Sequence, residues 1–395
     1  MAYGRSGAPD ARPLDGDSIF QIGSVTKVFT GLLLGDMVER GEVKLEDPAS
    51  TYLPPGVTMP QRGRPITLID LSKHWSGLPS MPTNFRLEAE PNPYEAYGVE
   101  QLYTFLSSHQ LAREPGTQAY SNVGVALLGR LLARRAGLEY EELLQQRVLQ
   151  PLKMTSTGIT LTADQKRRSV PGHDRFLRPV DTWYLKTMPA SGSLWSSAND
   201  LLTFLSFSLG AQDTPLRSAM LLQRVRGRAL GWGASRLGGE TVYNHEGGKE
   251  GYRSAAVMNP RTQTGVVVLM NARSEDSPLA LARHLLFSES PLEPASSAPA
   301  APAFVALTPA VLDAAAGEYE LESKQLLRIA PKRDHLLVDT RGDGILTFFP
   351  TSEGGFVANT EDQRLTFERD SGGATTGLVL HSAGKVQKGV RLRSR

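Results

Sequence analysis

The chain has 395 residues, a formal net charge of +2 and no cysteine. This length predicts at least two cores, and the balance of 40% hydrophobic and 21% charged residues is that of a globular protein. So small a charge argues against nucleic acid or an anionic membrane as the main partner. The densest basic cluster is expected to be a solvated loop; it comprises Lys166, Arg167 and Arg168. The lack of cysteine excludes disulfides, thiolate catalysis and cysteine-ligated metal.

The start of the sequence bears on localisation. No apolar run is long enough to span a bilayer, so we expect no membrane span. Residues 1–5 show no apolar region of the kind found in a signal peptide. The sequence as written therefore predicts a cytoplasmic protein, or a periplasmic or secreted one if it begins inside a longer chain.

The first half of the chain reads mainly as helices. Residues 16–23 predict a turn and a short strand, and from Ser24 apolar residues recur at helical spacing until Gly41 ends the pattern. A short helix is expected at 67–76, ended by Gly77 and Pro79. Further helices are predicted at 99–109, 122–136, 140–148 and 198–209.

Strand patterns begin near residue 229. Runs at 241–244, 252–258 and 264–270 predict strands, with a hairpin turn at 260–262 and a helix at 278–287. Strands at both ends of this region with helices between them predict an α/β (α+β) fold. We expect residues 1–287 to form one domain. Its antiparallel sheet would come from 1–23 and 229–287, flanked by helices, with an all-helical insertion at about 50–225.

The composition changes after this domain. Residues 288–303 are rich in Pro, Ala and Ser and predict a linker. Residues 304–395 contain short strand-like runs separated by Gly, Asp and Ser, which predict a small antiparallel β domain, barrel-like or sandwich-like.

We expect limited proteolysis to cut first between residues 288 and 302, because this composition leaves little to bury. The measurement is N-terminal sequencing and mass analysis of the first fragments. An intact chain after a digestion that degrades other loops would contradict a flexible linker.

The first candidate chemical motif is Ser24-Val25-Thr26-Lys27. A serine at a helix start with a lysine three residues later places hydroxyl and amine on one helical face, where the helix N-terminus favours a developing anion. Lysine would need burial or a cationic neighbour to act as a base at neutral pH. The spacing alone also arises by chance about once in a chain this long, and Ser24 as a simple N-cap is the competing interpretation.

Two further motifs follow. Tyr120-Ser121-Asn122 precedes an apolar helix, so the tyrosine could exchange a proton with the nucleophile and the asparagine could bind a substrate carbonyl; a buried tyrosine with an asparagine N-cap is the alternative. His245-Glu246-Gly247-Gly248 follows a strand, and its glycines permit close approach of a ligand and an oxyanion-binding N–H; a hairpin turn with a surface histidine is the alternative.

Together the motifs have the order and element types of a known superfamily. The chain resembles the serine β-lactamase and penicillin-binding protein superfamily over about residues 2–286, and is closest in motif to class C β-lactamases and family VIII carboxylesterases. The flanking segments that share this resemblance are Phe20-Gln21-Ile22-Gly23, His74-Trp75-Ser76-Gly77-Leu78-Pro79, Leu127-Leu128-Gly129, Ala190-Ser191-Gly192-Ser193 and Gly251-Tyr252-Arg253-Ser254.

The resemblance implies acyl transfer without metal or cofactor. Ser24 would be the nucleophile, with Lys27 and Tyr120 sharing the roles of base and proton return; which of the two takes the first proton is open. The N–H groups of Ser24 and Gly248 would hold the oxyanion. The remaining implied roles are acyl orientation by Asn122, substrate binding by Glu246 and Gly247, and hydrogen bonding near Tyr120 by His245.

The expected substrate class follows from one position at which this chain differs from many β-lactamases. Many β-lactamases carry lysine where this chain has His245, which makes a small-molecule ester the favoured substrate and a carboxylesterase the favoured function. The alternatives are a class C-like β-lactamase, a D-amino-acid peptidase or DD-carboxypeptidase, a penicillin-binding sensor without turnover, and an inactive scaffold that binds through its C-terminal domain. The oligomeric state is not predicted. His74, in a helix-to-turn segment, is expected to make a structural hydrogen bond.

A second departure concerns the N-terminus. Members of the superfamily carry a helix and a first strand before the segment that matches residues 2–5. We expect either a truncated chain or a gap in the sheet that is filled by residues 1–7, by part of 304–395 or by a neighbouring chain.

Overall fold

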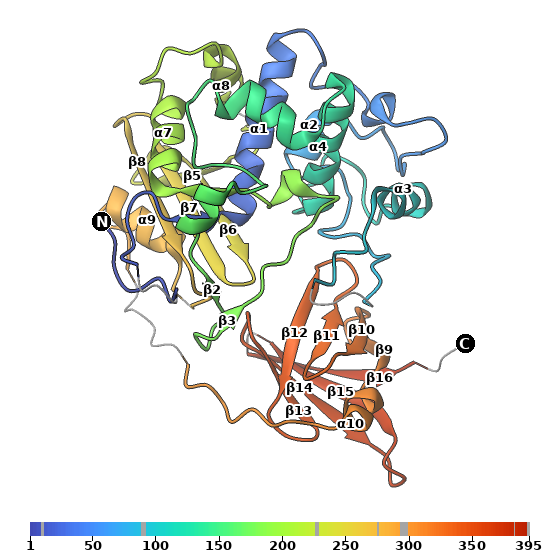
Figure 1. Ribbon diagram of the computed structural model, residues 1–395. Helices are drawn as coiled ribbons and strands as arrows, with labels where there is room; N and C mark the ends of the chain where they lie inside the picture. The colour runs from blue at the N-terminus through green and yellow to red at the C-terminus, as the bar shows by residue number, and fades with distance from the viewer. Residues whose placement is uncertain are drawn as a thin grey trace.

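The computed structural model describes residues 1–8, 12–87, 92–225, 229–274, 276–292, 299–382 and 384–392. Figure 1 shows an upper part of helices and a sheet, and a lower part that is a β-barrel. The predicted fold class is therefore confirmed, and the C-terminal strands close into a barrel instead of a sandwich. No helix within the described ranges is long and apolar enough to cross a membrane.

The main sheet is a four-stranded antiparallel sheet in the order β5-β6-β7-β8. Side chains of alternate residues point to opposite faces of a strand. Ala255 and Val257 of β7 therefore pack with helix α9, whereas Ala256 and Met258 join the main core on the other face. The strands are β5 (Gly233–Leu237), β6 (Glu240–Lys249), β7 (Tyr252–Asn259) and β8 (Thr264–Met270).

Helix α1 crosses the centre of the upper part (Figure 1) and is buried on nearly all sides. Its apolar residues surround the helix, as expected for a helix inside a core. Gly31 permits the closest approach, because a Cβ there would lie 2.3 Å from the Leu230 carbonyl oxygen. The helices and helical turns of this part are η1 (Gly23–Val25), α1 (Thr26–Glu39), η2 (Ala49–Tyr52), α2 (Leu68–Ser72), α3 (Val99–Ser108), α4 (Asn122–Ala136), α5 (Tyr140–Leu144), η3 (Gln145–Leu149), α6 (Ala163–Arg168), η4 (Pro189–Ser191), α7 (Ala198–Leu209), α8 (Arg217–Arg224) and α9 (Pro278–Leu286).

The N-terminal segment does not join the main sheet, so the prediction of a sheet from both 1–23 and 229–287 is wrong in its first half. Strand β1 (Ile19–Gln21) pairs with β4 (Trp195–Ser197) in a separate two-stranded sheet. Residues 1–8 contain no strand, and the Ser6 carbonyl accepts a hydrogen bond from Asn271, just after β8. Within the described ranges, neither 1–8 nor any barrel strand pairs with the main sheet. Another small pair is β2 (Gly172–His173) with β3 (Pro179–Val180).

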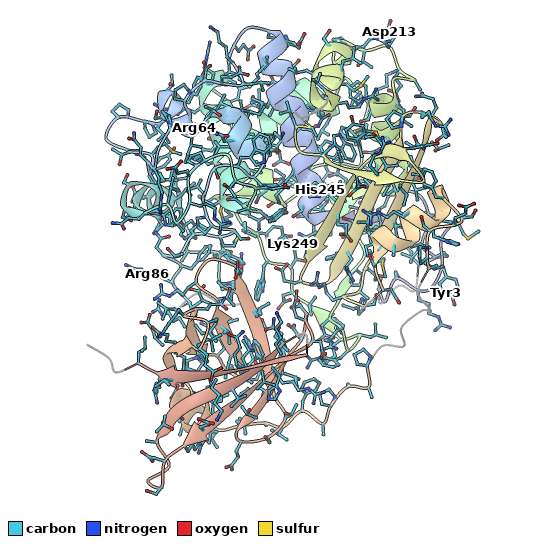
Figure 2. All side chains as sticks on the ribbon, turned by 180° about the vertical axis from the view of Figure 1, so that it is seen from behind. Tyr3, Arg64, Arg86, Asp213, His245 and Lys249 are labelled. Atoms are coloured by element: carbon cyan, nitrogen blue, oxygen red, sulfur yellow. The ribbon has the colours of Figure 1, made fainter. Side chains whose placement is uncertain are left out.

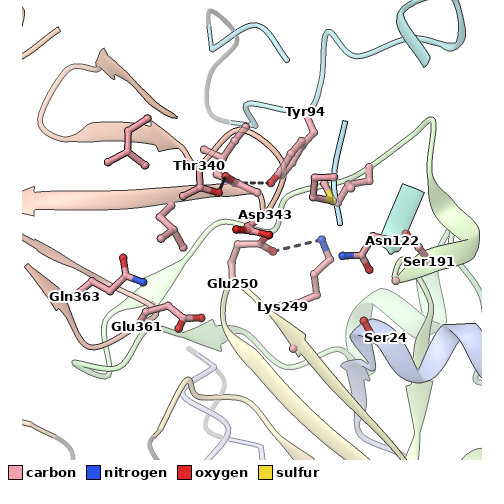
Figure 3. A pocket seen from close by; sticks show the side chains of 18 of the residues that line it. Ser24, Tyr94, Asn122, Ser191, Lys249, Glu250, Thr340, Asp343, Glu361 and Gln363 are labelled. Atoms are coloured by element: carbon pink, nitrogen blue, oxygen red, sulfur yellow. Dashed lines mark hydrogen bonds and ion pairs between the residues drawn. The ribbon is translucent and has the colours of Figure 1, made fainter. Parts of the chain in front are cut away.

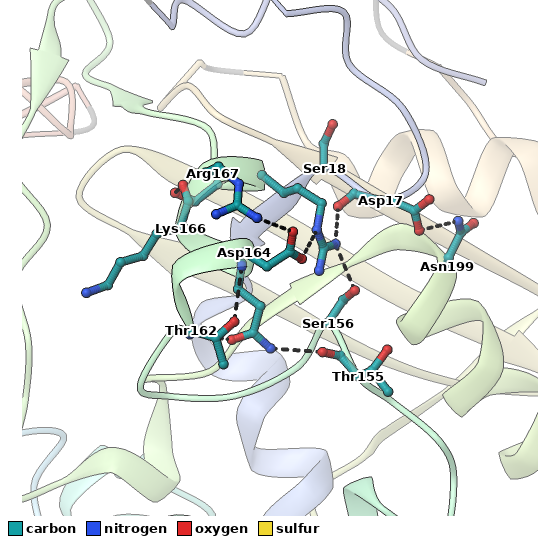
Figure 4. A network of polar contacts seen from close by, with 12 residues as sticks. Asp17, Ser18, Thr155, Ser156, Thr162, Asp164, Lys166, Arg167 and Asn199 are labelled. Carbon is teal, nitrogen blue, oxygen red and sulfur yellow. Dashed lines mark hydrogen bonds and ion pairs between the residues drawn. The ribbon is translucent and has the colours of Figure 1, made fainter.

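A polar network anchors the chain just before β1 (Figure 4). Arg168 donates to the Asp17 carbonyl and to Ser156 Oγ, both at 2.9 Å, and Asn199 donates to Asp17 Oδ1 at 2.8 Å. The basic cluster that ends at Arg168 was expected to be a solvated loop. The cluster forms the last turn of α6, so the expected loop is wrong, whereas Lys166 and Arg167 are solvated as expected and only Arg168 is partly buried.

The barrel closes in the order β10-β11-β12-β13-β14-β15-β16-β9 around its own apolar core. Closure pairs every strand on both sides, which removes exposed sheet edges. The predicted linker 288–303 includes residues 293–298, which lie outside the described part of the chain. The barrel elements are α10 (Pro309–Ala314), β9 (Gly317–Leu321), β10 (Leu326–Pro331), β11 (Leu336–Asp339), β12 (Ile345–Pro350), β13 (Gly355–Ala358), β14 (Gln363–Arg369), β15 (Thr375–Ser382) and β16 (Lys385–Arg391).

Candidate active site

Ser24 lies in a tight turn between β1 and α1. The turn η1 holds Ser24, and Gly23 before it has a φ of +49°. A Cβ on Gly23 would lie 2.7 Å from the backbone nitrogen of Gly248. Only glycine permits both this conformation and this approach, so the turn brings the nucleophile directly against strand β6.

Lys27 lies one turn further along, in the first turn of α1, and is fully buried. Its Nζ lies 2.9 Å from Ser24 Oγ. It also lies 2.7 Å from Asn122 Oδ1 and 2.5 Å from the Ser191 carbonyl oxygen. The helical spacing predicted from the sequence thus places amine and hydroxyl in contact, and two acceptors from distant segments complete the environment of the amine.

The second motif reaches Ser24 from the start of α4. The Tyr120 hydroxyl donates to Ser24 Oγ at 2.7 Å. Ser121 is the N-cap of α4, because its Oγ accepts from the Gly124 N–H at 2.9 Å. The alternative of an asparagine N-cap is therefore wrong, and the Asn122 side chain is left to bind Lys27 and Ser80.

His74 supports this loop from behind. Its Nδ1 accepts a hydrogen bond from the Ser121 N–H at 3.1 Å, and its ring packs on the Tyr120 ring with centroids 4.4 Å apart. The expected structural hydrogen bond is present. Burial, followed by the charge of Lys27, lowers the pKa of His74 to about 4, so the ring is neutral near pH 7.

The protonation states of Lys27 and Tyr120 follow from their surroundings. Burial, followed by the positive charge of Lys249, holds the pKa of Lys27 well below its usual value. Burial raises the pKa of Tyr120 to about 12, although its hydrogen bond to Ser24 acts in the opposite direction. A buried amine favours its neutral form and a buried phenol its protonated form, so Tyr120 is a proton donor at neutral pH.

The third motif lies on β6, against the Ser24 turn. Gly247 is buried, and a Cβ there would lie 2.0 Å from the Ile22 carbonyl oxygen, which also accepts from Ser254 Oγ. Gly248 follows, beside Gly23. The absent side chains therefore let β6 approach the nucleophile. Glu246 is exposed, and it lines a cavity that also contains Tyr120 and His245.

His245 shares a cleft with Tyr120 but is not hydrogen-bonded to it among the contacts of the described residues. Its Nδ1 lies 2.7 Å from the Glu246 carbonyl oxygen, which can only accept, so Nδ1 carries the proton. Burial, followed by the charge of Lys27, lowers the pKa of His245 to about 3. A neutral imidazole therefore lies where many β-lactamases carry lysine.

Two cavities meet at Ser24. One runs past Tyr120 and His245. The other lies on the side of Asn122 and continues to the end of the barrel, past Lys249 and Glu250. Figure 2 shows His245 and Lys249 along β6, with Lys249 nearer the barrel, and Figure 3 shows the second cavity.

Sequence reasoning missed several residues of this site. The Ser191 carbonyl contacts Lys27, and the only signal was the resemblance of its segment. Lys249 lies four residues beyond His245, on the same face of β6, which alternation could have indicated. The barrel residues beyond it carried no signal. No group of three or more possible metal ligands occurs in the parts of the chain that the structure describes.

Comparisons with known proteins identify relatives of this chain. A family model described as "Beta-lactamase" matches residues 1–289. The D-alanyl-D-alanine-carboxypeptidase/endopeptidase AmpH of Escherichia coli is 31% identical over 281 residues, which cover 64% of this chain and 71% of that protein. Neither description is of a carboxylesterase, so the favoured ester specificity gains no support from these two comparisons.

Solved structures share the fold. The class C beta-lactamase of Rhodobacter sphaeroides aligns with a TM-score of 0.62 and 25% identity, over 72% of this chain and 88% of that one. The octameric penicillin-binding protein homologue of Pyrococcus abyssi aligns with a TM-score of 0.63 and 21% identity, over 98% of this chain and 91% of that one. The second alignment extends over the barrel, and at this identity it concerns the fold alone.

Proposed function

Because the chain belongs to the beta-lactamase family of serine hydrolases, we propose that it hydrolyses small peptides or esters through an acyl-enzyme on Ser24. One observation carries this proposal: Ser24 Oγ contacts both Lys27 Nζ, at 2.9 Å, and the Tyr120 hydroxyl, at 2.7 Å. A hydroxyl becomes a nucleophile when a base takes its proton and an acid protonates the leaving group. Both kinds of group touch this serine.

Lys27 is the base for the first proton in this proposal. A neutral amine has two N–H donors and one lone pair. The Asn122 Oδ1 and the Ser191 carbonyl can only accept, and so they take the two donors. The lone pair is then left for the third contact, with Ser24 Oγ. This arrangement supports transfer of the Ser24 proton to Lys27 as the C–O bond of the acyl-enzyme forms.

Tyr120 completes the acylation step. It holds its proton at neutral pH and contacts Ser24 Oγ from a cavity that Asn122 does not line, so it gives that proton to the departing oxygen or nitrogen. The N–H groups of Ser24 and Gly248 stabilise the oxyanion, consistent with the approach of Gly248 to the nucleophile turn. Water then attacks the acyl carbonyl and gives a proton to the Tyr120 phenolate, and Lys27 returns its proton to Ser24 Oγ as the acyl C–O bond breaks, which restores the starting state.

Two substrate classes follow from different observations. The similarity to a protein named a D-alanyl-D-alanine-carboxypeptidase/endopeptidase supports peptide bonds next to D-amino acids. The neutral His245 supports simple esters over β-lactams, because a neutral imidazole attracts the carboxylate of a β-lactam less than an ammonium group would.

We expect the specificity constant for p-nitrophenyl butyrate to exceed that for the cephalosporin nitrocefin by about tenfold or more. A factor of this size corresponds to the loss of one favourable charge–charge contact with the β-lactam carboxylate. The assay panel should also contain D-Ala-D-Ala peptides, to compare esters with peptides. A larger constant for nitrocefin would overturn the ranking. A burst of one product per enzyme with no later turnover would identify a penicillin-binding sensor and contradict hydrolysis.

A further inference from the structure

The cavity on the Asn122 side of Ser24 is closed by the barrel. It has a volume of about 480 Å³. One wall contains Ser24, Asn122 and Gly192, and the opposite wall is the barrel end, with Gln325, Asp343 and Gln387 among its residues. Figure 3 shows the side chains of the barrel facing those of β6 and α4 across this space. In the proposed mechanism Tyr120 protonates the leaving group, and Tyr120 lines the other cavity at Ser24. The cavity on the Asn122 side is therefore where the acyl group would be held.

Backbone contacts fix the barrel in this position. The Met81 N–H donates to the Gly342 carbonyl at 2.6 Å, the Ile345 N–H donates to the Tyr94 hydroxyl at 3.2 Å, and Arg341 donates to the Thr83 carbonyl at 2.9 Å. These bonds join the turn between β11 and β12 to the helical part. The cavity wall is therefore built into the fold, and it limits the length of the acyl group.

The lining of the cavity carries more negative than positive charge. Its carboxylates are those of Glu250, Asp343 and Glu361, and Lys249 is the one cation among its described residues. Glu361 pairs at 3.0 Å with Arg273, outside this cavity. Against these three carboxylates stand two cations: Lys249, which lies 3.6 Å from Glu250, and Arg273, which also acts electrostatically on Glu250. One negative charge is left over.

Two buried acceptors in the same lining lack a hydrogen bond within the described ranges. Gln387 Oε1 has no partner, and Glu250 Oε2 has only the Lys249 ammonium group at 3.6 Å, beyond hydrogen-bond distance. Buried acceptors without partners are uncommon, because they lose water without replacing it. Both groups accept and neither can donate here, so they complement a ligand that brings N–H donors.

We propose that this cavity selects acyl groups that carry a protonated amine. An ammonium group offers three donors and a positive charge. It can donate hydrogen bonds to the acceptors that lack them, and its charge offsets the excess negative charge of the lining. The inference rests on the proposed function, and it narrows the substrate class to compact aminoacyl esters and amides, with the ammonium group held near Glu250 and Asp343.

The test compares benzyl esters of three six-carbon acids: hexanoic, 2-aminohexanoic and 6-aminohexanoic acid. Benzyl alcohol release gives kcat/KM, and each value is divided by the rate of alkaline hydrolysis of the same ester, because an amine changes intrinsic reactivity. We expect at least one amino ester to exceed hexanoate by about tenfold or more, as for a charge-assisted hydrogen bond. The position of the favoured amine locates the subsite.

The double variant Glu250→Gln, Asp343→Asn should bring this ratio close to one, and Lys249→Met should raise it. Glu353→Gln, at an exposed barrel residue outside the cavity, is the matched control and should keep the wild-type ratio. Melting temperatures identify any variant that fails to fold. A wild-type ratio near one, or a ratio unchanged in the folded double variant, would overturn the inference while Ser24-dependent hexanoate hydrolysis persists. Hexanoate hydrolysis that survives Ser24→Ala would instead overturn the proposed function, and the inference with it.

Discussion

Replacement of Ser24 by alanine is expected to lower kcat/KM for a short ester by about 10³-fold or more. Ser24 Oγ is the hydroxyl that Lys27 and Tyr120 both contact. Alanine removes the atom that forms the acyl bond and leaves both neighbours without their shared partner. The residual rate would come from oxyanion stabilisation and binding alone.

The measurement is ester hydrolysis by purified Ser24→Ala, together with mass analysis for the acyl-enzyme. Ser108→Ala is the matched control, because the Ser108 hydroxyl is exposed on α3 and bonds within its own helix; wild-type kinetics are expected. Near wild-type hydrolysis by Ser24→Ala would show that the nucleophile lies elsewhere.

Replacement of Lys27 by arginine should cost a comparable factor, about 10³-fold in kcat/KM. Arginine keeps a positive charge but does not lose its proton in proteins. If Lys27 acts as a neutral base, the guanidinium cannot replace it. If Lys27 acted only as a cation, Lys27→Arg would retain far more activity than Lys27→Met, and this difference would contradict the base assignment.

The pH dependence of kcat/KM gives a second test of Lys27 as the general base. The base must be neutral, so kcat/KM should fall as the pH falls through the pKa of Lys27, which burial holds well below its usual value. His245, with a pKa of about 3, stays neutral over this range and does not contribute. In Lys27→Met this acid limb should disappear from the residual activity. Lys324→Arg, at an exposed barrel lysine, is the control for the charge-preserving change and should leave rate and profile unaltered.

Local patterns explain what was predicted correctly. Helical periodicity after Ser24 predicted α1, and the three-residue spacing to Lys27 placed amine and hydroxyl on one face, as found. Apolar runs with turn residues predicted strands at the positions of β6, β7 and β8 and the hairpin turn between β7 and β8, although β6 continues past the predicted 241–244 to Lys249. These sequence patterns depend only on residues that are close neighbours along the chain.

The missed elements lacked such local signals. In the barrel, β9, β13 and β16 were not predicted. Strand β16 (Lys385–Arg391) is largely polar and exposed, so it carries little apolar pattern. Strands β9 and β16 pair with each other to close the barrel, although their residues lie far apart in the sequence. Residues 1–7, proposed as one filler of the sheet, contain no strand; the Ser6 carbonyl accepts a hydrogen bond from the Asn271 side chain just after β8.

Local motifs identify the reactive groups of the site, Ser24, Lys27 and Tyr120, and helical spacing alone accounts for the contact between Ser24 and Lys27. The contact of Tyr120 with Ser24, across 96 residues, and the surroundings of all three groups depend on the folded chain. The burial that lowers the pKa of Lys27, the Ser191 carbonyl that accepts from it, and the barrel wall beside Glu250 all come from segments distant in the chain. Protonation states and cavity shape depend on which distant groups exclude water, and no short stretch of sequence contains that information.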